Sequence, residues 1–224
     1  MMSIVWNKIE ALAKQLESKF NATGEPIKSA AVDDYTWHNQ LWSSTRYRRA
    51  HVEIVDNRET HKIFILHCTV FPHFNDPSPI WGFDAVCGPN KITGAFCDFS
   101  PAGDPNHPMM RWFANEALYY NWKRERNLPE WAQHIFSPSM VAAGNIQAGE
   151  ELDNLCELAT RTLDYYLKNV GNTQQDLADY HMAQNLYCHY QKQNPHVIKS
   201  MVSMGVEEST IKRFVSEVLF PEVV

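Results

Sequence analysis

The sequence predicts an α+β protein in which helices cover a mostly antiparallel sheet. Two observations lead to this fold class. Short apolar runs rich in Ile, Val and Phe, bounded by Pro, Asn, Asp or Gly, fill much of the first half and are typical of strands. Stretches with apolar residues at three- and four-residue steps dominate the second half and predict helices. Strands followed by helices favour α+β over alternating α/β architecture.

The first 60 residues predict a helix, an irregular segment and a strand. Residues 3–20 place apolar side chains at helical spacing, and 21–26 end the helix. Residues 27–47, which include Asp33, Asp34 and Tyr35, fit a loop or an edge strand. Residues 48–56 alternate in polarity and predict a strand with His51 and Glu53 on one side.

Three further strands are predicted between Lys62 and Pro101. The runs KIFILHCTVF, IWGFDAVCG and ITGAFCDFSP are separated by the loops PHFNDPSP and PNK. Successive side chains of a strand point to opposite faces. His67 and Asp84 therefore sit on strands that could place them on one face, together with His51 and Glu53, although the register between strands is not determined by the sequence.

The rest of the chain is predicted to be mainly helical. A turn-rich loop, AGDPNHP, precedes the first of these helices, and 136–142 is ambiguous. Gly171 is placed to end the strongest helix. The predicted helices span 107–126, 150–170, 174–193, 196–204 and 207–219.

The polar residues of the predicted sheet share a face with apolar side chains, which is unusual for a solvent-facing surface. Ile63, Ile65 and Phe71 follow the same alternation as His67. Titratable groups among apolar ones cost several kcal/mol, of order 2–7 for a single polar group, unless they are paired. Such clusters mark functional sites, because burial and mutual charge shift pKa values. A satisfied structural network is an equally good interpretation of the pattern alone.

Composition sets broad limits on function. The 224 residues suit one domain spanning 1–224, and the net charge of −6 argues against nucleic-acid binding. No stretch approaches the apolar length of a membrane span, and the N-terminus lacks the layout of a signal peptide, so we expect a cytoplasmic protein. The five cysteines contain no C-x-x-C pair and are expected to be reduced thiols.

Several common kinds of active site have no motif here. The chain has no G-x-G-x-x-G, Walker or G-x-S-x-G motif. A metal site built from His181, His189 and Asp84 is an alternative that we do not expect, because no tight ligand spacing such as H-E-x-x-H supports it.

Motifs spread over nearly the whole chain are collectively specific. They are RYRRAHVEI at 46–54, ILHCTVFP at 65–72, PIWGFDAV at 79–86, DFSP at 98–101, NLPEW at 127–131, NLYCHYQKQN at 185–194 and VSEVLF at 215–220. In these segments the chain resembles the ferredoxin-dependent bilin reductases, and within them the phycocyanobilin:ferredoxin oxidoreductase branch.

The resemblance implies a three-layer α/β/α sandwich with a central antiparallel sheet. It also implies an oxidoreductase that binds biliverdin IXα between the sheet and the C-terminal helices. No metal, flavin or nicotinamide is expected, and reduced ferredoxin supplies electrons from outside. A monomer is expected. Ferredoxins are acidic, so docking on a basic patch is expected, with these candidate residues: Arg46, Arg48, Arg49, Lys62, Arg124 and Lys199.

The resemblance also implies roles for site residues. The family's proton-donor pair falls on His67 and Asp84, and we expect Asp84 to donate first while His67 positions it. A further polar pair near the vinyl-bearing ring falls on His51 and Glu53, of which Glu53 is expected to be catalytic. Positions that anchor the substrate propionates fall on Thr93, Arg126 and Gln191. The small residues Gly82, Thr93, Gly94, Ala95 and Cys97 are expected to form a floor for a flat ligand. Without the resemblance, close packing of helices explains these small residues nearly as well.

One departure from the family pattern affects the expected product. After NLYCHYQKQN the family has an Asp proposed as a proton donor, whereas here Asn194 is followed by Pro195 and His196. Asn194 and His196 are expected to contact the substrate. The departure resembles that of the viral or metagenomic phycocyanobilin-reductase-like subgroup, whose members make phycoerythrobilin. Phycoerythrobilin, formed through 15,16-dihydrobiliverdin, is therefore the expected product. Phycocyanobilin is the alternative, and a bilin carrier without catalysis is a third possibility.

Overall fold

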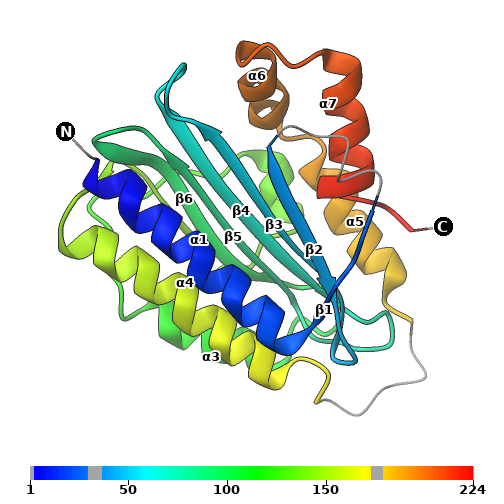
Figure 1. Cartoon of the computed structure of the whole chain (residues 1–224). Helices are drawn as coiled ribbons and strands as arrows, with labels where there is room; N and C mark the ends of the chain where they lie inside the picture. Colours follow the sequence, from blue (N-terminus) through cyan, green and yellow to red (C-terminus); the bar gives the residue numbers. More distant parts are fainter. Residues whose placement is uncertain (1–2, 30–36, 173–178, 224) are drawn as a thin grey trace.

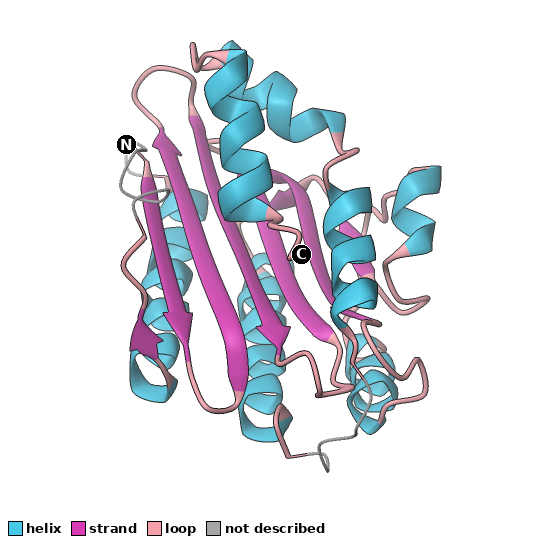
Figure 2. Cartoon of the chain, turned by 90° about the vertical axis from the view of Figure 1, so that its right-hand side faces the viewer, coloured by secondary structure: helices cyan, strands magenta, loops and turns pink. Residues whose placement is uncertain are grey.

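The computed structural model describes residues 3–29, 37–172 and 179–223. Its described strands form one antiparallel sheet with helices on both faces (Figure 1). Helices α1, α3 and α4 cover one face, and α5, α6 and α7 lie against the other, as the turned view in Figure 2 also shows. The predicted α+β class with a central antiparallel sheet is confirmed.

The sheet follows the chain almost in sequence order, β1 to β7, with β8 paired to β6. Each neighbouring pair is antiparallel, so short connections suffice. The strands are β1 (Glu25–Pro26), β2 (His38–Ser43), β3 (Tyr47–Asn57), β4 (Ile63–Pro72), β5 (Ile80–Cys87), β6 (Lys91–Ser100), β7 (Val141–Ala143) and β8 (Ile146–Gln147).

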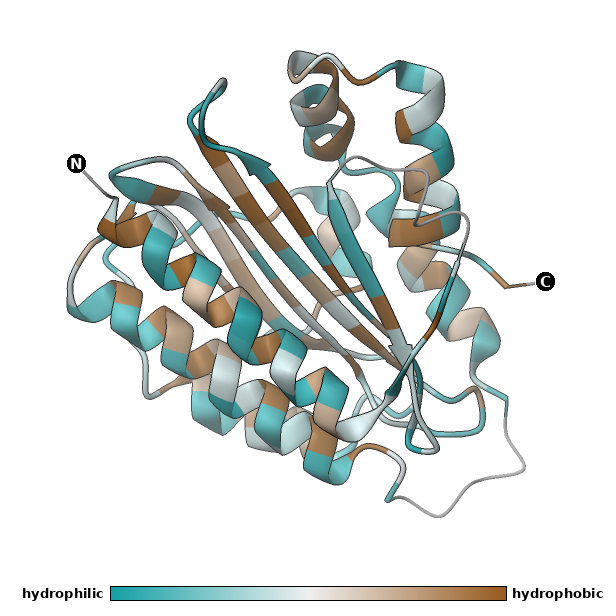
Figure 3. Ribbon diagram, in the orientation of Figure 1, coloured by the Kyte–Doolittle hydropathy of each residue, from teal (hydrophilic) through white to brown (hydrophobic). Residues whose placement is uncertain are grey.

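The helices that cover what we call the inner face are α1 (Ile4–Thr23), α3 (Pro108–Ala117) and α4 (Glu150–Asn169). The Ser3 hydroxyl caps α1 by accepting a hydrogen bond from the Trp6 amide. The apolar stripes of these helices meet every second residue of the strands, including Leu66, Phe83 and Trp81, in one buried cluster. Hydrophobic and hydrophilic residues alternate along the strands in Figure 3, as this arrangement requires.

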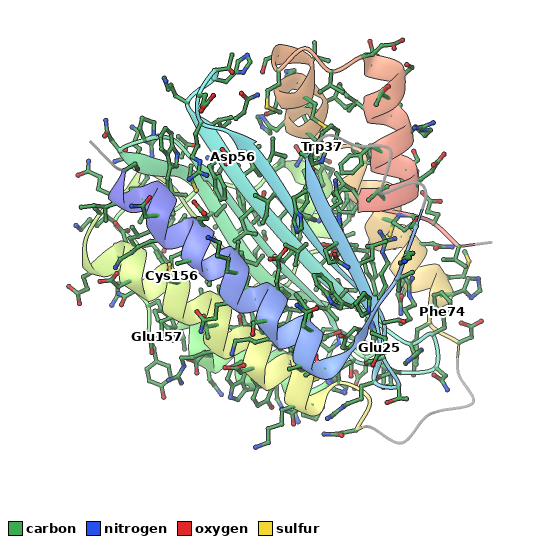
Figure 4. The ribbon with its side chains drawn as sticks, in the orientation of Figure 1. Glu25, Trp37, Asp56, Phe74, Cys156 and Glu157 are labelled. Atoms are coloured by element: carbon green, nitrogen blue, oxygen red, sulfur yellow. The ribbon has the colours of Figure 1, made fainter. Side chains whose placement is uncertain are left out.

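The outer face is covered by α5 (His181–Gln191), α6 (Pro195–Ser203), α7 (Glu208–Phe214) and the π-helical turn Val215–Leu219. A second buried cluster joins these elements to Phe71 and Ile80 of the sheet. The covering helices therefore explain why apolar residues share a face with the polar ones. Figure 4 labels Trp37 beside α7 on this side and Cys156 on α4 on the other.

Two predicted elements differ from the structure. The helix predicted over 107–126 ends at Ala117, because 124–126 runs extended beside β7: the Arg126 amide donates to the Ala142 carbonyl and the Gly144 amide to the Arg124 carbonyl. The helix predicted over 174–193 is described only from His181, and residues 174–178 lie outside the described residues. The same holds for Asp33, Asp34 and Tyr35 in the segment predicted as loop or edge strand.

The described helices include none that is long and apolar enough to cross a bilayer. All five cysteines are free thiols, as predicted.

Candidate active site

A row of three titratable residues crosses the middle of the outer face. Glu53 of β3 lies directly opposite His67 of β4, and His67 lies directly opposite Asp84 of β5. Side chains at directly opposed positions of antiparallel strands share a face and have Cβ atoms about 4.5–5.5 Å apart. The row extends to Asn39 on β2 and Phe96 on β6. The structure thus brings together the residues that the sequence placed on one face without a register.

A second row runs beside the first. His51 of β3 lies opposite Thr69 of β4, and Thr69 lies opposite Gly82 of β5. The His51 and His67 rings are 6.3 Å apart between centroids. Beyond Gly82, Asp98 of β6 continues the row. The Asp98 carboxylate is fully engaged, since it accepts hydrogen bonds from Ser100 and from both the amide and the hydroxyl of Ser137. Asp98 therefore has a structural role.

Four other polar atoms in the two rows are buried without a hydrogen-bond partner among the described residues. They are Nδ1 of His51, Oε1 of Glu53, Nε2 of His67 and Oγ1 of Thr69. His51 is 0% and Glu53 4% exposed. Leaving a buried polar atom unpaired costs about 1–3 kcal/mol, and native proteins contain few such atoms. Four in one patch indicate a surface built to contact polar groups of a ligand.

Burial shifts the proton affinities of this patch. It raises the pKa of Asp84 to about 7, against a lowering effect of the Ala85 amide. Burial, reinforced by the charge of Asp84, raises the pKa of Glu53 to about 8. Burial also lowers the pKa of His67 to about 4 and that of His51 well below its usual value. Near neutral pH the histidines are therefore uncharged, Glu53 is mostly protonated and Asp84 is partly protonated, so both carboxyls can donate protons.

Aromatic residues of the C-terminal half cover the rows. The Phe220 ring packs edge-on against His67 at 5.8 Å between centroids. The Tyr187 hydroxyl lies over Gly82, 3.7 Å from where a Cβ at that position would be, and accepts a hydrogen bond from Gln191. Among these, only Gln191 was singled out from the sequence. Tyr187 and Phe220 lie in the motifs NLYCHYQKQN and VSEVLF, but the sequence does not show which side chains of these motifs face the site.

Arg126 reaches the site from the extended segment beside β7. Its guanidinium donates to the Thr93 carbonyl at 2.7 Å and lies 5.6 Å from the centroid of the Phe96 ring, which stands opposite Asp84. Gly94 leaves room for it, because a Cβ there would lie 2.8 Å from the guanidinium. Arg126 is exposed and retains donors that can bind a carboxylate.

Not all of the residues predicted for the site lie at the two rows. The predicted floor of small residues is wrong for Ala95 and Cys97, which belong to the inner-face core, whereas Gly82 lies under Tyr187 and Gly94 beside Arg126. Asn194 caps α6 by accepting a hydrogen bond from the His196 amide at 3.0 Å, and His196 is exposed. No described contact joins Asn194 or His196 to the two rows.

Three arginines proposed for ferredoxin docking are not a free row on the surface, because each bonds to another part of the fold. Arg48 bonds to Gln184 and lies over Phe71, while Arg49 donates to the Val218 carbonyl. Arg46 binds carbonyl groups at the end of α4. These three side chains fasten the sheet to neighbouring elements. Among the described residues, no group of three or more His, Cys, Asp or Glu side chains is arranged to hold a metal ion, and His181 pairs instead with Asp179.

Comparison with known proteins identifies the family. Residues 5–221 match the sequence profile described as "Ferredoxin-dependent bilin reductase". The chain belongs to this family. Its members are oxidoreductases.

Two similar proteins agree with this family. It is 28% identical over 190 residues to the phycocyanobilin:ferredoxin oxidoreductase of Prochlorococcus marinus (strain MIT 9313), covering 82% of this chain and 70% of the relative. A solved structure of a protein named PcyX is 26% identical, with a TM-score of 0.70 over 96% of this chain and 99% of the other.

The fold extends to more distant relatives. Tomato phytochromobilin synthase, solved in complex with biliverdin, has a TM-score of 0.73 at 13% identity, covering 96% of this chain and 82% of the other. At that identity the similarity shows the shared fold alone.

Proposed function

We propose that this protein reduces biliverdin IXα to a phycobilin in single-electron steps from reduced ferredoxin, with protons supplied by the outer-face row. The observation that carries the proposal is the direct alignment of Glu53, His67 and Asp84 across three strands, with the pKa of both carboxyls raised to near or above neutral pH. A reductase that receives electrons singly needs such groups, because each electron added to an extended π-system must be trapped by a proton.

Asp84 is proposed as the first donor. One electron converts the bound bilin to a radical anion, and proton transfer from the Asp84 carboxyl neutralises it. His67 stays uncharged at neutral pH, since burial lowers its pKa to about 4. It is proposed to position Asp84 and to share its proton, so that the pair titrates jointly. Burial on a covered face keeps the carboxyl protonated until the bilin demands the proton.

Glu53 is proposed as a second donor. It lies across His67 from Asp84, in the direction of β2, and holds its proton more tightly than Asp84. Two donors at opposite ends of one row could serve two regions of a long substrate. We propose that Glu53, with His51, serves the vinyl-bearing ring.

Arg126, Thr93 and Gln191 are proposed to hold the propionates. Arg126 and Thr93 already contact each other at the β6 side of the row. Gln191 is buried on α5 with its amide on the Tyr187 hydroxyl, facing the sheet from the opposite side. An arginine fork binds a carboxylate through two parallel hydrogen bonds, which favours Arg126 as the main anchor.

We propose phycoerythrobilin as the product and placement near the viral or metagenomic subgroup. The support is the Pro195 departure, which removes the carboxyl of the family pattern from the start of α6. Phycocyanobilin is the second candidate, because the curated relative from Prochlorococcus carries that activity in its name.

Exposed cations are proposed to dock the acidic donor. With Arg48 and Arg49 engaged inside the fold, the exposed candidates are Lys62, Arg124 and Lys199. We expect the reduction rate at limiting ferredoxin to fall as salt rises, because screening weakens attraction between exposed charges. A rate that is independent of salt would contradict docking by charge.

The proposal is tested by anaerobic incubation of the protein with biliverdin and a reduced-ferredoxin supply, followed by chromatographic separation against known bilins. The expected result is conversion through a dihydrobiliverdin to phycoerythrobilin. Phycocyanobilin would support the second candidate. A stable coloured complex that is unchanged by reduced ferredoxin would contradict catalysis and identify a bilin carrier.

A further inference from the structure

Asn39 extends the outer-face row of Glu53, His67 and Asp84 to β2, where it lies directly opposite Glu53. Its side-chain oxygen Oδ1 is 3.0 Å from Nε2 of His51, and its amide nitrogen Nδ2 donates to the Trp37 carbonyl at 3.2 Å. A single amide thus connects backbone before β2 to a buried imidazole in the site.

The Trp37 carbonyl fixes the orientation of this amide. A carbonyl oxygen only accepts hydrogen bonds, so the group that faces it must be the donor Nδ2. The reversed amide would place two acceptors against each other at Trp37. Oδ1 therefore faces His51, and Nε2 of His51 must carry the hydrogen that it donates.

The orientation of the amide determines the proton state of His51. A neutral imidazole has one hydrogen, so a hydrogen on Nε2 leaves Nδ1 with a lone pair. Nδ1 is buried and has no partner among the described residues, and His51 is 0% exposed. The charged or titratable groups that act on it are Arg49 on its own strand, His67 on β4 and His38 on β2. All three disfavour a second proton.

We propose that Asn39 is a positioning residue that holds His51 as the Nε2–H imidazole, so that Nδ1 accepts a hydrogen bond from a pyrrole or lactam N–H of the bound bilin. His51 then acts as an acceptor that orients the substrate, and the protons come from the carboxyls beside it. The role toward the bilin rests on the proposed function, whereas the tautomer is a property of the protein alone.

The test is nitrogen NMR of protein labelled with ¹⁵N-histidine. Without ligand, we expect His51 to be neutral at pH 7 with its hydrogen on Nε2. His38 serves as an internal reference, because its hydrogen bond to Glu17 raises its pKa. On addition of biliverdin, the Nδ1 resonance should shift as it accepts a hydrogen bond. A His51 that carries its hydrogen on Nδ1, or two hydrogens, would overturn the proposal whether or not bilin is reduced.

Variants separate positioning from general support of the fold. Asn39→Leu removes the acceptor and should abolish the slowly exchanging Nε2–H signal and lower kcat about fivefold to tenfold, the size of one hydrogen bond. Asn39→Asp keeps an acceptor oxygen, so it should retain the Nε2–H signal and shift the His51 titration upward. Gln40→Leu, one residue along β2, is the matched control and should leave His51 unchanged. An Asn39→Leu spectrum identical to the wild type would contradict the assignment.

If the tautomer is as expected but biliverdin is never reduced, the proposed function fails while the role of Asn39 in setting the His51 tautomer stands.

Discussion

The two faces of the sheet are built from the same strands but carry different side chains. The inner face is an apolar core, and the outer face carries a row of titratable groups. On the inner face, the Trp81 indole donates to Thr162 at 3.1 Å, and the Tyr166 hydroxyl donates to the Pro79 carbonyl at 2.9 Å. On the outer face, His51, Glu53 and His67 keep buried polar atoms without partners among the described residues. Residues one position apart therefore serve stability and chemistry separately.

This division has a simple origin in strand geometry. Phe83 and Asp84 are neighbours in sequence, yet Phe83 packs with the inner core and Asp84 lies in the polar row. Because side chains alternate, the inner face can be packed for stability without constraining the outer one. Natural proteins retain unpaired buried groups at functional sites and compensate elsewhere.

The largest expected effect on stability comes from the inner face. Phe83→Ala should lower the free energy of unfolding by about 3–5 kcal/mol, because a fully buried ring is lost and a cavity is left. Denaturant unfolding measures this. Asp84→Asn is the matched control on the adjacent residue, and it should leave stability equal or higher. Equal losses in both variants would show that the faces are not separate in their roles.

The second prediction concerns pH. Burial and Asp84 raise the folded pKa of Glu53 to about 8, so the folded state binds its proton more tightly than the unfolded chain. The contribution of Glu53 to stability is then largest below its unfolded pKa and is lost as pH rises towards 8. Glu53→Gln removes this loss. Thermal unfolding should show the variant more stable than wild type at pH 9 by up to about 5 kcal/mol, because the pKa rises from 4.5 to about 8 and each pKa unit is worth roughly 1.4 kcal/mol.

At pH 4 the same two proteins should unfold at nearly equal temperatures. A difference that does not change between pH 4 and pH 9 would mean that Glu53 is ionised in the folded protein, and its proposed role as an acid would be wrong.

The third and smallest effect should appear at the edge of the outer face. Arg126→Gln should weaken biliverdin binding about tenfold, or about 1.4 kcal/mol, because a charged hydrogen bond to a carboxylate is lost. Absorbance titration without ferredoxin measures this directly. Arg124→Gln, two residues away and also exposed, is the control and should bind normally. Equal affinity of the Arg126→Gln variant and the wild type would show that a residue other than Arg126 anchors the propionate.

The sequence predicted which residues share a face, but the register between strands was not predictable. Alternation placed His67 and Asp84 correctly within their strands, whereas their direct opposition depends on pairing across a turn of variable length. The structure or the family resemblance was therefore needed to recognise the row as a candidate site.

Long-range contacts explain the errors. Residues 118–126 contain good helix formers, but the stretch at 124–126 pairs with β7, which no local pattern reveals. Arg48 and Arg49 were expected on the surface because charged side chains are seldom buried. They are accommodated by Gln184 and by the Val218 carbonyl, both more than 100 residues away. Asn39 was missed because an isolated Asn in an irregular segment gives no signal.

The central claim is that the outer-face row delivers protons through Asp84. Its most direct test is Asp84→Asn with bound biliverdin under anaerobic conditions, followed by absorbance and electron paramagnetic resonance as reduced ferredoxin is added. The account predicts that biliverdin binds with near wild-type affinity, that an organic radical accumulates, and that turnover falls by about 10²-fold or more. Turnover at the wild-type rate without accumulation of a radical would contradict it.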